Sequence, residues 1–455
     1  MERENSFTTG PILGPLVRFA LPVLFALFLQ ALYGAIDLWV VGKFAAAADV
    51  SGVSTGSQIT QTVAIVITGL AMGITVQVGQ KIGEGRPDEA GRAIGSGITL
   101  FCLLALAVTA VMVPGAGAIS RLMQAPPEAL KETTAYVRLC SAGTVFIVAY
   151  NVLGSIFRGI GDSKMPLYTV GIASVFNVAG DLFFVAVLHM GAAGAAIATV
   201  MAQALSVLLS WLLIRRRNLP FTMTRSDLRM NGPIVGRILG LGVPIALQDL
   251  LVSISFLVIM AIVNTRGLIA SAGVGVAEKV CAFIMLVPSA FEQAMSAFVA
   301  QNVGAGEHQR ARLALRYSVL TSAVVGVVMA WAAFFHGEVL AWVFSRDREI
   351  ISAAADYLRA YGIDCLLTCF LFCFIGFYNG YGKTVLVMAQ GIFGAFAIRI
   401  PVAYFMSRDS AASLFHIGLA TPSSTVVQII ICLVALAVLR HKLGREEQKP
   451  VQKRA

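Results

Sequence analysis

The chain has 455 residues, of which 58% are apolar and only 13% are charged, and its mean hydropathy is +0.82. A soluble globular domain of this length carries far more charge, so a water-soluble fold is excluded. The sequence contains no Walker phosphate-binding loop, Rossmann glycine pattern or nucleophile elbow. These absences argue against ATP-driven transport and against ordinary enzymology in this chain.

Long apolar stretches, each near the ~20 residues that cross a bilayer, follow one another from end to end of the chain. In lipid, every backbone polar group must bond within the protein, and the sequence lacks the alternating pattern of an outer-membrane barrel, so these stretches predict helices. We therefore predict an all-α integral membrane protein. Its twelve predicted transmembrane helices cover about 16–41, 53–79, 93–114, 133–156, 166–188, 191–214, 234–263, 268–299, 313–335, 353–377, 385–406 and 415–439.

The second half of the chain repeats the first at an offset of 221–222 residues. Each copy opens a hydrophobic span with a proline, Pro22 or Pro244, and each then reaches a Gln-x-x-Gly-x-Gly turn, at 80–85 or 301–306. We predict two parallel, pseudo-symmetric six-helix bundles with the substrate path between them, a layout typical of membrane transporters. The predicted parts are an N-terminal lobe at 1–214, a cytoplasmic linker at 215–233, a C-terminal lobe at 234–440 and a basic cytoplasmic tail at 441–455.

The distribution of Lys and Arg predicts the orientation in the membrane. With both termini in the cytoplasm, cytoplasmic segments hold 23 of the 34 basic residues, external loops hold 7 and predicted helices hold 4, in keeping with the positive-inside rule. This bias accounts for the net charge of +10, so no nucleic-acid partner is implied. We expect a multi-pass protein of the inner (plasma) membrane without a cleavable signal peptide. Two basic clusters contribute most to this orientation. They are Arg215, Arg216, Arg217, Arg225, Arg229 and Arg237 in the central loop and Arg440, Lys442, Arg445, Lys449, Lys453 and Arg454 in the tail.

Polar residues inside the predicted spans are the first candidates for function, because a charge at membrane depth is expensive. Asp37 lies about five residues from the outer end of the first span, Asp181 about seven from that of the fifth, and Thr199 about eight residues into the sixth. At ~1.5 Å per residue, all three lie roughly 8–12 Å below the external surface. The other polar side chains on the same helix faces are Tyr33 and Gln30, with Asp37, and Asn177, with Asp181.

Two carboxyl groups at one depth in a low-dielectric site cannot both be ionised at little cost, so at least one is expected to take up a proton. The same oxygens could instead bind Na⁺, with Asn177 and Thr199 completing the shell around Asp37 and Asp181. Either event changes the local charge and can bias two alternative helix packings. The competing interpretation is that each aspartate only caps or hydrogen-bonds a neighbouring helix.

The second half carries a different set of acidic residues, Asp249, Glu278 and Asp364, in the seventh, eighth and tenth spans. They form a candidate second cation site, but a structural ion pair between Lys279 and Asp249 or Asp364 fits the sequence equally well. Arg399 interrupts the eleventh span and is interpreted as a helix-end contact. Because the acidic residues of the two halves do not correspond, we expect the N-terminal half to carry ion coupling and the C-terminal half to help shape the pocket.

Several short motifs, weak singly but specific in this order and spacing, resemble those of the multidrug and toxic compound extrusion (MATE) family over all twelve spans. They are residues 30–37 with Val41 and Gly42, 159–163, Asn177 with Asp181, 301–306, 380–384 and 399–401. The resemblance implies a secondary exporter with two six-helix lobes that alternate around a central cavity, and it looks closest to the DinF-like branch. It also implies an N-terminal cation site at Asp37, Asn177, Asp181 and Thr199. The proline that often follows the fifth-helix aspartate in the family is Leu182 here.

We therefore predict a multidrug antiporter that exports lipophilic or cationic small molecules against inward H⁺ or Na⁺ by alternating access. The alternative is a lipid-linked glycan or lipid flippase of the same superfold, which would need several basic residues in the cavity. Only four basic residues lie more than three residues inside the predicted spans: Arg138, Lys279, Arg359 and Arg399.

No cofactor is expected apart from the transported H⁺ or Na⁺, and no other metal is expected. All seven cysteines fall in predicted helices, and Cys365, Cys369 and Cys373, on one helix face, are interpreted as packing residues. The expected partners are small-molecule substrates and membrane lipids, and the chain is expected to act as a monomer.

Overall fold

The computed structural model describes residues 7–216, 219–221, 223–409 and 412–447, and it confirms the predicted all-helical membrane architecture. In this part of the chain eleven helices are long and apolar enough to cross a membrane. A bent pair, Pro127–Ala142 with Thr144–Gly159, makes twelve if it is counted as one span. Five basic residues used for the orientation lie outside the described residues: Arg3, Arg217, Lys449, Lys453 and Arg454.

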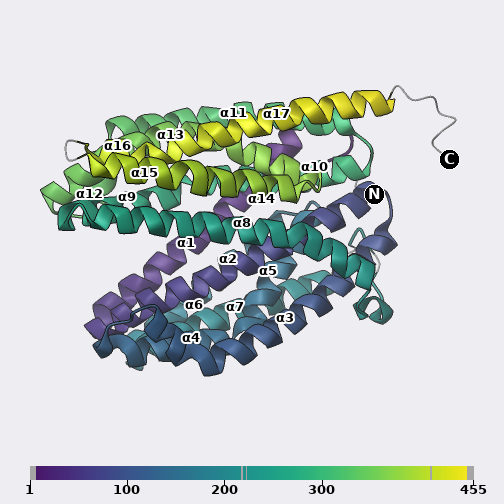
Figure 1. Ribbon diagram of the computed structural model, residues 1–455. Helices are drawn as coiled ribbons and strands as arrows, with labels where there is room; N and C mark the ends of the chain where they lie inside the picture. The colour runs from purple at the N-terminus through teal and green to yellow at the C-terminus, as the bar shows by residue number, and fades with distance from the viewer. Residues whose placement is uncertain (1–6, 217–218, 222, 410–411, 448–455) are drawn as a thin grey trace. The chain divides into compact units, whose positions relative to one another are not determined.

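Figure 1 shows the helices, which short connections join. Most of them extend beyond the predicted spans, because a helix continues past the apolar window into its polar ends. The α-helices are α1 (Leu13–Phe44), α2 (Ala47–Gly83), α3 (Pro87–Leu122), α4 (Leu130–Ala142), α5 (Thr144–Gly159), α6 (Lys164–Asp181), α7 (Gly191–Arg216), α8 (Gly232–Asn264), α9 (Leu268–Ile284), α10 (Leu286–Gly304), α11 (His308–Phe335), α12 (Gly337–Trp342), α13 (Arg348–Gly380), α14 (Thr384–Ile392), α15 (Ile400–Arg408), α16 (Leu414–Gly418) and α17 (Ala420–Glu447). The short segments are η1 (Pro127–Ala129), η3 (Arg225–Leu228) and two π-helical turns, η2 (Leu182–Val187) and η4 (Phe393–Arg399).

The fourth predicted span, at 133–156, is bent in the structure. Its two helices, α4 and α5, meet at Gly143 with an angle of 54° between the pair. A Cβ atom on Gly143 would lie 2.5 Å from two methyl carbons of Val200 on α7. The missing side chain therefore allows α7 to pack directly against the bend, a contact that hydropathy does not reveal.

The chain folds into two compact units. The first contains residues 1–250, 289–318 and 376–385, and the second contains 251–288, 319–375 and 386–455. The core of the first unit includes Ile74, Ile94 and Phe101, which are almost fully buried. In the second unit, α15 and α17 run side by side (Figure 1), and its core includes Tyr357 and Ile417. These units group residues by contact and not by repeat, so the predicted lobe boundaries stay a prediction.

The two Gln-x-x-Gly-x-Gly turns, predicted from the repeat, contact each other within the first unit. Gln301 Nε2 donates to the carbonyl oxygen of Gly159 at 2.8 Å, and Gln80 Nε2 donates to that of Gly380 at 3.1 Å. A Cβ atom on Gly83 would lie 1.9 Å from the carbonyl oxygen of Gln301, so this turn has no room for a side chain. The repeat therefore produces two equivalent glutamine hydrogen bonds, Gln301 to Gly159 and Gln80 to Gly380, which we call the glutamine latch.

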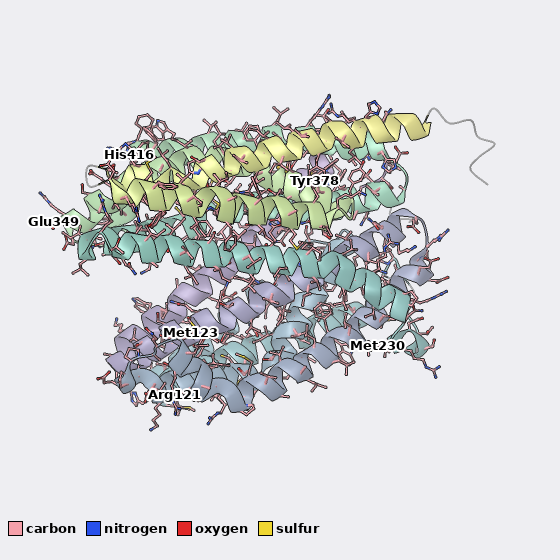
Figure 2. All side chains as sticks on the ribbon, viewed as in Figure 1. Arg121, Met123, Met230, Glu349, Tyr378 and His416 are labelled. Carbon is pink, nitrogen blue, oxygen red and sulfur yellow. The ribbon has the colours of Figure 1, made fainter. Side chains whose placement is uncertain are left out.

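The outer surface of the helices is largely apolar, as lipid contact requires. In the first unit Phe25, Trp39 and Val175 are each more than half exposed. Charged side chains lie at helix ends instead: Figure 2 shows Arg121 at the end of α3 and Glu349 in the first turn of α13. This distribution fits a multi-pass membrane protein.

Candidate cation site

Asp37 on α1, Asp181 at the end of α6 and Thr199 on α7 come together in the first unit. The Thr199 hydroxyl group donates to Asp37 Oδ2 at 3.4 Å, and the carboxyl group of Asp181 interacts with that of Asp37. Asp37 is 6% exposed and Asp181 is fully buried. Asn177, one turn before Asp181, is also buried and interacts with Asp37. The convergence predicted from depth is therefore found in the structure.

Close packing of α6 on α7 brings these groups to one level. A Cβ atom on Gly180 would lie 3.0 Å from the Cβ of Ala198, so the two helices approach as closely as side chains permit. Asp181 and Thr199 directly follow these two small residues. The small pair thus sets the spacing at which the carboxyl and hydroxyl groups meet.

Most oxygens of this cluster have no hydrogen-bond partner among the described residues. They are Asp37 Oδ1, both carboxyl oxygens of Asp181 and Oδ1 of Asn177. Buried polar atoms are rarely left unpaired in a folded protein, and each one costs free energy. A group of unpaired carboxyl and amide oxygens suits a proton or a small hard cation, which oxygen ligands bind. The cluster could thus hold H⁺ on a carboxyl group, or Na⁺ between the four side chains predicted for it.

A π-helical turn, η2, begins directly after Asp181. Such turns are rare and widen the helix locally, often at functional sites. Leu182, which stands where the family often has proline, is the first residue of this turn. Hydrophobic periodicity does not reveal this turn, because a π-turn inserts only one extra residue into the helix.

Tyr33 and Gln30, predicted on the face of Asp37, connect the cluster to neighbouring helices. The Gln30 amide donates to the hydroxyl group of Tyr150 on α5, and Tyr33 interacts with both Asp37 and the side chain of Gln203 on α7. Tyr150 and Gln203 were not predicted. Gln203 follows Thr199 by four residues and therefore shares its helix face, so the sequence could have indicated it. The direction in which Tyr150 points could not be predicted, because α5 follows a bend in the fourth span.

The acidic residues of the second half separate into two environments. In the second unit, Asp364 is 1% exposed and its Oδ1 accepts a hydrogen bond of 2.6 Å from Thr425. Glu278, half-buried on α9, interacts with Cys281, as Asp364 does. In the first unit, Asp249 interacts with Glu292. Because Asp249 belongs to the first unit and the other two residues belong to the second, a shared cation site for the three stays a prediction.

Two predictions about basic residues of the second half need revision. Lys279 is exposed and forms no ion pair with Asp364 in the described part of the chain, because α9 turns it away from the interior. Arg399 is not a helix-end contact. It is 5% exposed at the end of η4, donates to Ser255 Oγ at 3.0 Å and stacks its guanidinium 4.4 Å from the ring centroid of Phe256.

The fold and the buried polar cluster define a helical membrane protein of the transporter class. The MatE family profile matches residues 22–183 and 244–405, one match in each half of the chain. The chain is 24% identical over 431 residues to "Probable multidrug resistance protein YoeA" of Bacillus subtilis, covering 91% of each chain. It is 21% identical over 446 residues to "Multidrug export protein MepA" of Staphylococcus aureus, covering 96% of each.

Among solved structures, one described as the outward-facing conformation of a multidrug resistance MATE family transporter matches with a TM-score of 0.91. It shares 20% identity and covers 99% of this chain and all of that one. The chain belongs to the multidrug and toxic compound extrusion family, whose members are transporters and not enzymes. Both the family and the fold predicted from the sequence are therefore confirmed.

Proposed function

We propose that this protein is a secondary active multidrug exporter, which moves lipophilic or cationic small molecules outward in exchange for inward H⁺ or Na⁺. The observation that carries the proposal is the buried pair of carboxyl groups, Asp37 and Asp181, with unpaired oxygens. The names of the relatives, which are multidrug resistance and export proteins, support the substrate class.

Exchange follows from competition for one negative site. A proton, a Na⁺ ion or a cationic substrate would each neutralise the cluster, and two cations in the same buried site would repel each other. Loading the site from one side therefore favours release of the other cation, which couples the two movements without a further component. The transporter then needs only two conformations that expose the cluster to opposite sides.

The glutamine latch supports alternating access. In it, Gln80 near the end of α2 bonds to Gly380 at the end of α13, and Gln301 near the end of α10 bonds to Gly159 at the end of α5. With both termini in the cytoplasm, as the basic residues predict, the latch lies on the cytoplasmic side. A state with the latch formed would be closed there, and opening that side would break these two hydrogen bonds.

The test is transport by purified protein in liposomes, followed with a fluorescent lipophilic cation under an imposed pH or Na⁺ gradient. We expect Asp37→Asn to reduce gradient-driven transport at least about tenfold, because it removes one of the two carboxylates that bind the exchanged cation. Glu128→Gln, which neutralises an exposed carboxylate of η1, is the matched control and should transport normally. Normal transport by Asp37→Asn under either gradient would refute the role of the Asp37 cluster in cation exchange. Asp249, Glu278 and Asp364 would then be the next candidates.

A further inference from the structure

A cavity of about 100 Å³ lies in the first unit, among α1, α2, α5, α6, α7 and α10. Its polar lining includes Gln30, Thr68, Tyr150, Asn151 and Arg158. Among the described residues that line it, Arg158 is the only one with a charged side chain. The sequence placed Arg158 in a loop, because the fourth span was predicted to end at 156, whereas α5 continues to Gly159.

The guanidinium of Arg158 lacks a partner that matches its charge. Within the described part of the chain, its one hydrogen bond runs from Nη2 to Ser155 Oγ at 2.9 Å, and its Nε is buried without an acceptor. No carboxylate of the described residues forms an ion pair with it. Gly154 leaves space for the group beside the helix, since a Cβ atom there would lie 3.3 Å from Nη1. An arginine held this way inside a membrane protein is costly unless something compensates its charge.

Neutral polar groups carry no charge to balance the guanidinium, and four of those in the cavity already make other hydrogen bonds. Thr68 Oγ1 donates to Asn151 Oδ1 at 2.9 Å, and the Asn151 amide donates to the carbonyl oxygen of Ile147 at 2.8 Å. Gln30 donates to the Tyr150 hydroxyl group. What the cavity still lacks is an anionic acceptor for the planar guanidinium, and carboxylates and phosphates match its geometry best.

The size and place of the cavity indicate how such an anion would be carried. The volume suits a single carboxylate or phosphate group and is too small for a whole drug-sized molecule, whose pockets are several times larger. Gln30, which lines the cavity, lies on α1 seven residues before Asp37, so this edge of the cavity is roughly 10 Å from the cation site along the helix. A molecule of moderate length could therefore reach both.

We propose that this cavity is a subsite in which Arg158 binds the carboxylate or phosphate group of an amphiphilic ligand. This inference rests on the proposed export function and names a residue that would discriminate among its substrates. The positive subsite at Arg158 and the negative cluster at Asp37 would orient a zwitterion by its two ends.

The test uses two dyes that differ only in one group: a rhodamine with a free carboxylate, which is a zwitterion, and its methyl ester, which is a cation. Binding to the detergent-purified full chain is measured by fluorescence anisotropy, which needs no ion gradient. We expect wild type to bind the free acid at least about tenfold more tightly than the Arg158→Gln variant, with binding of the ester unchanged by the substitution. Arg158→Lys should retain part of the difference, and Arg138→Gln, which alters an exposed arginine on α4, should retain all of it.

A second arm distinguishes a transported anion from a lipid headgroup. Nanodiscs of phosphatidylcholine are compared with nanodiscs that contain phosphatidylglycerol, and the thermal unfolding of wild type and Arg158→Gln is measured in each. Stabilisation by phosphatidylglycerol that requires Arg158, without discrimination between the dyes, would assign the site to a lipid phosphate. If wild type binds acid and ester equally and phosphatidylglycerol does not stabilise it, the subsite is refuted, and this outcome needs only the wild-type protein. A successful dye test with inactive transport would instead refute the proposed function alone.

Discussion

Thr421 and Thr425 lie one turn apart on α17, and both side chains are buried. Thr425 donates to the buried carboxyl group of Asp364, whereas the hydroxyl oxygen of Thr421 is buried with no partner in the described part of the chain. We predict that Thr425→Val lowers the free energy of unfolding by about 1–3 kcal/mol, because it leaves a buried carboxyl oxygen unsatisfied. Thermal unfolding of the purified protein in detergent measures this effect.

Thr421→Val is the matched control, since it replaces an unpaired buried hydroxyl group with a methyl group of similar size. It should be neutral or slightly stabilising. Equal destabilisation by both substitutions would show that helix packing around α17, and not the hydrogen bond to Asp364, produces the effect.

At the scale of elements, the contact of α6 with α7 should set the geometry of the cation site. Gly180→Val places a branched side chain where a Cβ atom already lies 3.0 Å from Ala198, so it must push the helices apart and separate Asp181 from Thr199. We predict overpacking of about 1–3 kcal/mol and a clear loss of gradient-driven transport. Both are measured on the same purified protein, by thermal unfolding and by the liposome assay.

Gly171→Val is the control for this prediction, because it lies on the same helix and carries the same propensity cost. A Cβ atom on Gly171 would meet only the end of the Leu29 side chain, at 3.7 Å. This variant should transport nearly as well as wild type. If both variants lose transport equally, helix propensity rather than the α6–α7 spacing explains the loss.

At the scale of the whole molecule, the basic residues predict that both termini are cytoplasmic. Single cysteines at Glu349 and His441, both exposed, test this in a Cys102→Ser background, because the other six cysteines are buried. We predict that a membrane-impermeant maleimide labels Glu349→Cys only from outside intact cells and His441→Cys only in inside-out vesicles. Labelling of both from the same side would contradict the predicted number of crossings between them, and the reverse pattern would invert the topology.

Much of the fold was predictable because it depends on hydropathy and on sequence repeats, which are averaged over many residues. Twelve apolar windows and the repeat of Pro22 at Pro244 are visible without any contact information, and both agree with the helices and with the two family matches. The bend at Gly143 and the π-turn after Asp181 were not predictable, because each depends on one residue that changes the local helix geometry.

A helical membrane protein with a duplicated half, and with Asp37, Asp181 and Thr199 at one depth, could be predicted from the sequence alone. Hydropathy, repeats and the fixed rise of a helix are enough for those statements. Contacts between helices were needed to bring Tyr150 to Gln30 and Arg158 into the cavity. The physical reason is that helix rotation and tilt decide which faces meet, and these come from packing between residues far apart in the chain.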